Sequence, residues 1–465
     1  MPRAARFFVI AFVALIVSPV ATAGAATRMP IGFFDDPSFR WSPAAPQNLA
    51  AAAAAGATII HTTANWATIA PTRPQFPADP DDTAYHLSDL DTLVRESARY
   101  GLRVMIDVTG SPKWANGGLS PNHMPKHLSD FATFVKMLAL RYDGRNIGKG
   151  EVSLWSVWNE PNLQQFLTPQ YVGKRIVSPS NYAKLYKTAY AAIKSENPWA
   201  KVAIGETSAQ GRDKPTKGSS QTVSPGTFMK LLSKVKGLRF DAWAHHPYPT
   251  ARTAKPLEKV RYPNVTLATL PTFEKALKAD FHRTVPVWIT EYGHETKPAQ
   301  PKGISLSLQA AYARQALTIA RNDPNVQMFC WFTFRDSSGN PWKSGIENAN
   351  GSPKPSFAAF SSLAHAIDGT TVSARSGRPM GAVTVYVPYL TFYNPVGVLV
   401  GVTYSVYDGS KLVAAGEPRG NIAPDSSVTF TPTFTPVRKH TYRIVATVND
   451  PNGNQQTRTV TVIAS

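Results

Sequence analysis

The sequence predicts an α/β fold, a (β/α)8 barrel, followed by a small all-β sandwich domain. Between about residues 29 and 368, short apolar runs alternate with amphipathic stretches, and eight such pairs can be counted. No glycine-rich phosphate loop follows the first apolar run, which favours a closed barrel over a doubly wound open sheet. After Asp368 the helix-forming residues thin out, and Val, Thr, Tyr, Pro and Gly dominate.

The N-terminus has the composition of a secretory signal peptide. Arg3 and Arg6 precede an apolar run at residues 7–17, and small residues at 21–23 form a cleavage site. This run is shorter than the roughly 20 residues that a membrane-spanning helix needs. We therefore expect residues 1–23 to be removed, and the mature chain, without a transmembrane segment, to be secreted or associated with the cell wall. The alternative is an uncleaved N-terminal anchor.

The barrel itself is predicted over residues 27–370. Its expected strands are short runs rich in branched and aromatic residues, and its expected helices are longer stretches with apolar residues three and four apart. The strands are predicted at residues 31–34, 58–61, 103–108, 153–158, 202–205, 240–244, 285–290 and 326–332, and the helices at 87–100, 128–142, 182–195, 228–235, 308–321 and 357–367.

Residues 376–465 are expected to form the second domain. Runs of period-two alternation end at turn signals, among them Asp408-Gly409 and the segment 451–454. The pattern is similar to the immunoglobulin-like modules that are often appended to extracellular enzymes. It predicts a small β-sandwich, for which attachment to a substrate or wall and passive packing are equally open roles.

Charge and cysteine content narrow the possible partners. The formal net charge is +19, so anionic wall polymers or acidic glycans are natural neighbours. The lysines and arginines are scattered, without the interleaved aromatic residues of a nucleic-acid platform, and we expect no nucleic-acid partner. Cys330, the one cysteine, lies in an apolar run, which indicates a buried small hydrophobe and excludes an intramolecular disulfide. A monomer is expected.

Two of the predicted strands end in a glutamate. The fourth ends in Trp-Asn-Glu-Pro at residues 158–161, and the seventh in Thr-Glu-Tyr-Gly at residues 290–293. The carboxyl ends of barrel strands form the active-site face, so Glu160 and Glu291 are expected to face one cavity. Glycoside hydrolysis needs such a pair: one carboxylic acid protonates the leaving oxygen, and one carboxylate attacks the anomeric carbon or activates water. The separation of the two groups, which decides between retention and inversion, cannot be measured from the sequence.

These two motifs resemble the signature of the clan A glycoside hydrolases, which are retaining (β/α)8 enzymes. Three further segments agree with the resemblance: Trp-Ala-Thr-Ile-Ala-Pro at 66–71, Ser-Pro-Lys-Trp-Ala at 111–115 and His-Pro-Tyr at 246–248. The end of the eighth strand, at Trp331 and 335–336, also agrees. Families 39 and 5 are the most similar, and the bacterial exopolysaccharide-cleaving members of family 39 have the most similar layout. One departure is Ala70, where the clan usually carries glutamate.

The resemblance implies roles for several residues. Glu160 is expected to be the general acid and then the base, and Glu291 the nucleophile. Asn159 would bind the sugar 2-hydroxyl, and Tyr248 or His246 would hydrogen-bond near Glu291, which would hold it ionised and lower its pKa relative to that of Glu160.

Aromatic side chains are expected to form the sugar platform. Trp331 would be its floor, with Trp66 and Trp114 as further candidates. No metal or organic cofactor is implied. The substrate is expected to be a carbohydrate, a polysaccharide or cell-envelope glycan and possibly an anionic one. Two other functions stay open: a catalytically silent carbohydrate-binding barrel, and a transglycosylase that uses the same residues.

Overall fold

The structure of the chain is a computed structural model. It describes residues 29–145, 149–217, 220–338, 340–368, 371–380, 385–394, 401–417, 426–430, 439–449 and 455–463, together with residues 434 and 437. The predicted signal peptide, residues 1–23, lies outside the described residues. In the part of the chain that is described, no helix is both long enough and apolar enough to cross a membrane.

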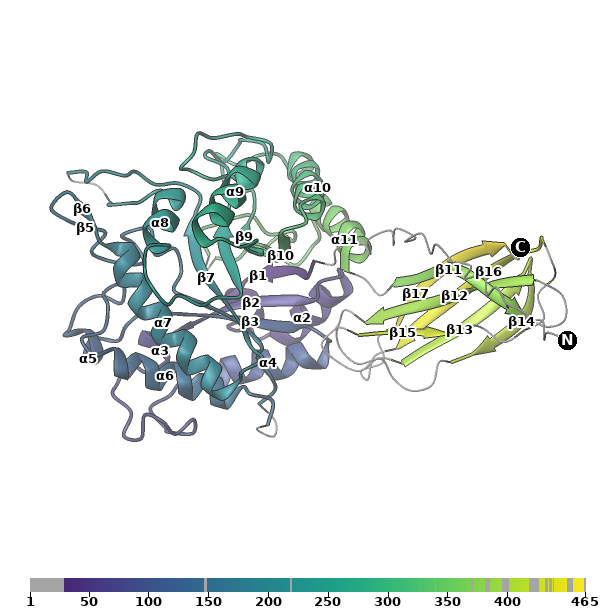
Figure 1. Cartoon of the computed structure of the whole chain (residues 1–465), viewed down its shortest axis with the longest axis horizontal. Coiled ribbons are helices and arrows are strands. Elements are labelled where there is room, and N and C mark those ends of the chain that lie inside the picture. Colours follow the sequence, from purple (N-terminus) through teal and green to yellow (C-terminus); the bar gives the residue numbers. More distant parts are fainter. Residues whose placement is uncertain are drawn as a thin grey trace, which may run out of the picture.

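Eight parallel strands close into a barrel, as the sequence predicted (Figure 1). Around the barrel the strands follow the order β1-β10-β9-β8-β7-β4-β3-β2, so neighbours in the chain are neighbours in the sheet except where the short β5 and β6 intervene. Each predicted run overlaps one strand. The strands are β1 (Ile31–Phe34), β2 (Ile59–Asn65), β3 (Arg103–Thr109), β4 (Leu154–Val157), β7 (Lys201–Ser208), β8 (Ala242–His246), β9 (Val287–Tyr292) and β10 (Val326–Trp331).

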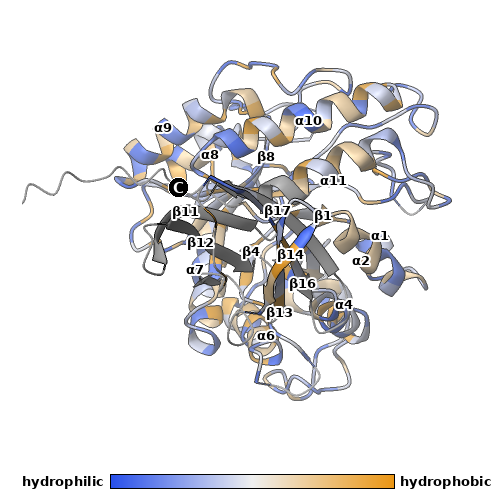
Figure 2. Cartoon of the chain, turned by 90° about the vertical axis from the view of Figure 1, so that its right-hand side faces the viewer, coloured by the Kyte–Doolittle hydropathy of each residue, from blue (hydrophilic) through white to orange (hydrophobic). Residues whose placement is uncertain are grey.

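Helices surround this barrel, and all six predicted ones are present. Their apolar stripes face the strands while their polar sides face outward, as the mixed hydropathy of α10 illustrates (Figure 2). The helices are α1 (Asp36–Phe39), α2 (Ala45–Ala54), α3 (Trp66–Ile69), α4 (Ser88–Arg99), α5 (Lys113–Asn116), α6 (Leu128–Arg141), α7 (Ser178–Glu196), α8 (Pro225–Leu232), α9 (Leu270–Phe281), α10 (Leu306–Asn322) and α11 (Pro355–Asp368), with a 3-10 turn η1 (Leu267–Thr269).

The barrel has two apolar layers, because side chains along each strand alternate between its two faces. The inner layer consists mainly of small and unbranched side chains around Trp288, and Cys330 is buried there as predicted. The outer layer, between strands and helices, holds the large residues, among them Phe33, Trp155 and Trp331. The same alternation decides which side chains at the end of each strand point into the barrel and which point toward the helices.

The C-terminal strands form two antiparallel sheets. One has the order β11-β12-β15, and the other β14-β13-β16-β17. In Figure 1 they lie beyond α11, to one side of the barrel. Asp408 pairs with Lys411, so the predicted turn is a two-residue hairpin in which Gly409 has a φ of 59°. The strands are β11 (Thr371–Met380), β12 (Val385–Asn394), β13 (Gly401–Asp408), β14 (Lys411–Gly416), β15 (Ser426–Phe430), β16 (Thr441–Asn449) and β17 (Gln455–Ile463), and β5 (Tyr171–Val172) and β6 (Arg175–Ile176) form a hairpin within the barrel domain.

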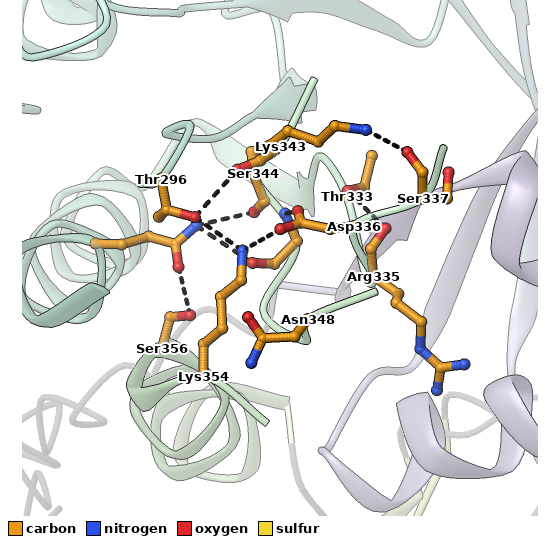
Figure 3. A network of polar contacts seen from close by, with 12 residues as sticks. Thr296, Thr333, Arg335, Asp336, Ser337, Lys343, Ser344, Asn348, Lys354 and Ser356 are labelled. Atoms are coloured by element: carbon orange, nitrogen blue, oxygen red, sulfur yellow. Dashed lines mark hydrogen bonds and ion pairs between the residues drawn. The ribbon is translucent and has the colours of Figure 1, made fainter. Parts of the chain in front are cut away.

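A buried polar network holds the long loop after β10 in place (Figure 3). The Lys354 ammonium donates to Asp336 Oδ2 at 2.7 Å and to Thr296 Oγ1 at 2.9 Å. The side chains of Lys354 and Asp336 are 1% and 5% exposed. Gln309 of α10 donates to the carbonyl oxygens of His294 and Ser344 at 2.9 and 3.0 Å. The network therefore ties this loop to the loop after β9.

Removing the Lys354 charge should destabilise the barrel. We expect Lys354→Met to lower the free energy of unfolding by about 3–5 kcal/mol, because Asp336 would then be a buried and unpaired carboxylate. The double variant Lys354→Met, Asp336→Leu should recover part of this loss, and Lys278→Met, on the exposed face of α9, should change little. Urea denaturation measures all three. A loss below about 1 kcal/mol for Lys354→Met would mean that the ion pair does not hold the loop.

Candidate active site

Glu160 lies three residues beyond the end of β4, in a segment with unusual dihedral angles. Trp158 and Glu160 have φ values of 69° and 37°, in the left-handed region that non-glycine residues rarely adopt. Backbone hydrogen bonds hold both: Trp158 N donates to Val108 O, and Glu160 N to Glu206 O, each at 2.9 Å. Strain of this kind persists where the surroundings over-determine it, which is common at functional sites. It directs the Glu160 carboxylate toward His246.

Glu291 lies near the end of β9 and is almost fully buried, at 8% exposure. The Tyr248 hydroxyl, two residues beyond the end of β8, donates to Glu291 Oε2 at 3.0 Å. Trp342, from the loop after β10, stacks on the Tyr248 ring with centroids 5.4 Å apart. The end of β8 thus contacts this carboxyl group directly, and the loop after β10 supports that contact through Trp342.

His246, the last residue of β8, joins the two glutamates. Its Nδ1 lies 3.0 Å from Glu160 Oε1 and 3.8 Å from Glu291 Oε1, so these two oxygens are within about 7 Å of each other. Its Nε2 lies 2.8 Å from Glu206 Oε2. Burial lowers the pKa of His246, but the carboxylates of Glu291, Glu160 and Glu206 outweigh burial and raise this pKa well above its usual value. The ring is therefore protonated and donates from both nitrogens.

The pKa of Glu291 differs from what the resemblance implied. Burial raises the pKa of this carboxyl group to about 7, and the nearby Glu160 adds to the rise. The positive charge of His246 and the Tyr248 hydroxyl lower the pKa, as expected, but by less than burial raises it.

Glu206 is a third carboxylate that the sequence interpretation missed. It is fully buried within β7, and Thr290 donates to its Oε2 at 2.7 Å. Burial raises its pKa, but the hydrogen bond and charge of His246 outweigh burial and hold the pKa at about 2. A register irregularity between Ile204 and Thr207 turns this side chain into the barrel, where plain alternation would not place it. Its position directly after the predicted fifth strand was a signal that could have identified it.

The tryptophans predicted as a sugar platform are mostly inaccessible. Trp331 is fully buried in the outer layer, and its indole donates to Ser344 O at 2.8 Å. Trp66 is 1% exposed and stacks on Phe134. Both predictions are wrong, because these rings face the helices and not the cavity. Trp114 is half-buried, and its indole donates to Ala70 O at 2.8 Å.

Phe332 and Trp342 occupy the place expected for Trp331. Met328 and Cys330 lie in the inner layer, so the alternation along β10 directs Phe332, and not Trp331, toward the inside at the strand end. Phe332 lies edge-on to Trp342, with ring centroids 6.4 Å apart and an interplanar angle of 78°. Trp342 is 38% exposed. The aromatic side chains at this place are therefore Phe332, one residue after Trp331, and Trp342, from the loop that the buried network holds.

In the part of the chain that is described, three cavities lie at the carboxyl ends of the strands. One, of about 420 Å³, is lined by Asn159 together with Thr63 and Asn65. A second, of about 640 Å³, shares Thr63 and Asn65 with the first and reaches Phe332. A third, of about 440 Å³, is lined by Tyr248 and Trp342. These volumes are within the range of about 300–1,000 Å³ that is typical of small-molecule sites.

Comparison with known proteins identifies a family. Residues 76–385 match the family model described as glycosyl hydrolases family 39. No protein with a curated function matches this sequence.

Several solved structures share the fold. A family 39 glycoside hydrolase from the gut symbiont Bacteroides cellulosilyticus WH2 is 17% identical, with a TM-score of 0.53, over 88% of this chain and 82% of that chain. A glucosidase from Croceicoccus marinus is 13% identical, with a TM-score of 0.55, over 88% and 94%. The GH5_18 protein from Streptomyces cattleya, in complex with GlcNAc, is 15% identical, with a TM-score of 0.52, over 73% and 80%. At these identities the likeness shows the fold alone.

Proposed function

Because the chain belongs to family 39 of the glycosyl hydrolases, we propose that it is a retaining glycosidase in which Glu291 is the nucleophile and Glu160 the acid and base. The single observation that supports this best is the position of both carboxylates on one histidine, within about 7 Å of each other. This upper limit allows the separation of about 5–5.5 Å at which a carboxylate attacks directly, and most of the wider range of inverting enzymes, about 6.5–9.5 Å, lies beyond it.

The reaction would proceed in two displacements. In the first, the Glu291 carboxylate attacks the anomeric carbon, the glycosidic C–O bond breaks, and Glu160 gives its proton to the leaving oxygen. In the second, Glu160 takes a proton from water, whose oxygen attacks the same carbon and releases Glu291. Asn159 would bind the sugar 2-hydroxyl, because it precedes Glu160 and lines the adjoining cavity.

His246 and Glu206 would act as positioning residues. The protonated imidazole lies between the two catalytic carboxylates, so it fixes Glu160 by a hydrogen bond and attracts Glu291. Glu206 would keep the imidazole charged and oriented, because its own position is fixed by Thr290. This arrangement would balance three acidic groups with one buried positive charge.

The pH dependence should reflect Glu291. The nucleophile must be ionised, and its pKa is raised to about 7, so the acidic limb of the kcat/KM profile should fall as the pH drops through about 7. Tyr248→Phe removes a hydrogen bond that favours the ionised form. We expect it to move this acidic limb upward by about one pH unit.

Measuring kcat/KM from pH 5 to 9 tests this expectation. Tyr100→Phe, at the far end of α4, serves as the control and should leave the limb in place. An unchanged limb in Tyr248→Phe would show that the tyrosine does not set the ionisation of the nucleophile.

The substrate would be a polysaccharide or a cell-envelope glycan. The net charge of +19 favours an anionic polymer or a wall surface as the working environment. Residues 1–23 would be a signal peptide for secretion, and residues 27–370 the catalytic domain of a monomer. Residues 376–465 would be an immunoglobulin-like module, since the two antiparallel sheets meet where β17 contacts β11 and β12.

A panel of 4-nitrophenyl glycosides of glucose, xylose, mannose, galactose and arabinose tests the activity. We expect hydrolysis of at least one, with retention of anomeric configuration in the first-formed sugar by NMR. Inversion would contradict the mechanism, and binding without turnover would indicate a silent barrel. Products lengthened by an added sugar acceptor would indicate transglycosylation.

A further inference from the structure

The largest of the three cavities at the strand ends lies beside the ends of β1 and β2. Its walls come from the ends of β1 and β2, the start of α4 and the loop after β10. Phe34, in its wall, packs against His61 with ring centroids 4.4 Å apart, and His61 Nδ1 lies 3.1 Å from Thr290 O. Thr290 directly precedes Glu291. The cavity of about 640 Å³ also shares Thr63 and Asn65 with the cavity that Asn159 lines, so it lies beside the segment that carries Glu160.

Trp41 lines this cavity and is 62% exposed, which is unusual for so large an apolar side chain. Its orientation is nevertheless fixed. The indole N–H donates to Asp89 Oδ2 at 3.2 Å, and the same oxygen accepts from Arg40 Nη2 at 2.7 Å. Arg40 is itself 5% exposed and donates to Thr63 O at 2.6 Å. An exposed ring held in this way needs little ordering when a ligand binds.

Polar groups with unused donors face the same cavity. The carboxamide oxygens of Asn65 and Asn340 accept from the backbone N–H groups of Ala67 and Trp342, each at 3.0 Å. Neither amide NH2 group donates to another residue in the part of the chain that is described. Both residues line the cavity. Their NH2 groups can therefore donate to hydroxyl oxygens of a ligand.

We propose that this cavity is a binding subsite for an additional pyranose unit of an oligosaccharide, with the sugar stacked on Trp41 and bonded by Asn65 and Asn340. A pyranose ring has an apolar C–H face and a rim of hydroxyl groups, which matches one aromatic platform flanked by amide donors. The inference rests on the proposed glycosidase function and adds to it the place where a further sugar unit of the substrate binds and the residues that hold it.

Calorimetric titration of the full-length Glu291→Gln chain with cellotetraose, xylotetraose and mannotetraose tests the subsite. We expect at least one tetrasaccharide to bind, and Trp41→Ala to weaken that binding about tenfold. Trp41→Phe keeps an aromatic face and should lose less. Trp199→Ala is the matched control, because Trp199 is 90% exposed and lies before β7, at the opposite end of the barrel. It should leave the affinity unchanged.

The outcomes separate the subsite from the proposed function. Equal affinities of Glu291→Gln with and without Trp41→Ala, or no binding of any tetrasaccharide, would overturn the subsite. Hydrolysis of aryl monosaccharides by the wild type is measured in parallel. If the aryl monosaccharides are hydrolysed but Trp41→Ala leaves tetrasaccharide binding unchanged, the glycosidase function stands and the subsite is wrong. If tetrasaccharide binding depends on Trp41 but nothing is hydrolysed, the subsite stands and the hydrolase proposal is wrong.

Discussion

Glu291→Gln should lower kcat by about 10⁵-fold, because the amide cannot form the covalent bond to the anomeric carbon that the first displacement requires. The fold should survive, since Tyr248 can donate to the amide oxygen as it does to Glu291 Oε2 in the wild type. Substrate affinity should change much less than kcat. Initial rates with the best aryl glycoside of the panel, together with the unfolding midpoint, measure both effects.

Glu151→Gln serves as the control for this substitution. Glu151 is an exposed glutamate just before β4, and its amide variant should keep full activity. A loss in Glu291→Gln of less than about 100-fold would remove Glu291 from the role of nucleophile, because a merely supporting group can account for a loss of that size.

Glu160→Gln should lower kcat/KM by about 10²- to 10⁴-fold, and the size of the loss should depend on the leaving group. A 2,4-dinitrophenyl glycoside releases a stable anion that needs no proton, so its first displacement should be nearly unaffected. A poor leaving group such as an alkyl alcohol should show the full loss. The second displacement should slow for every substrate, because water then lacks its base.

Added azide distinguishes this role from a structural one. Azide attacks without a general base, so it should restore turnover of the dinitrophenyl substrate by Glu160→Gln and give a glycosyl azide of retained configuration. In Glu291→Gln no glycosyl-enzyme forms, so azide should not give a glycosyl azide of retained configuration. Equal losses with both leaving groups, and no effect of azide, would mean that Glu160 does not transfer the proton.

Much of the fold followed from local patterns. Eight apolar runs predicted all eight barrel strands because each strand must bury both of its faces. The helix α2 was not among the predicted helices, because a run of six alanines, from Ala50 to Ala55, gives no apolar stripe to recognise. The helix α9 was also not among them. It begins with Leu270-Pro271, and proline, which often ends a helix, is equally suited to its first turn.

The site was harder to predict where backbone irregularities decide the side-chain direction. Glu160 and Glu291 could be proposed because each lies at the end of a recognisable strand. Glu206 directly follows the predicted fifth strand, but its inward direction could not be predicted, since the bulge in β7 that turns it inward depends on pairing with β8. The choice of Trp331 over Phe332 was wrong by one residue, which is enough to move a side chain to the other face of a strand.

The contribution of distant loops was also invisible to the sequence. Trp342 reaches Tyr248 only because the Lys354 and Asp336 pair holds its loop against the barrel. Trp41 faces a cavity only because Asp89, from another helix, fixes its indole. Contacts between residues that are far apart in the chain set both positions, and no local pattern encodes them.

The double-displacement mechanism is tested most directly by trapping the covalent intermediate. The wild-type chain is incubated with activated 2-fluoro glycosides of the sugars in the panel, digested and analysed by mass spectrometry. The mechanism predicts one added 2-fluoroglycosyl group on the peptide that contains Glu291, absent in Glu291→Gln and still formed, more slowly, in Glu160→Gln. An adduct on Glu160 or Glu206, or none with a sugar whose ordinary glycoside the chain hydrolyses, would contradict it.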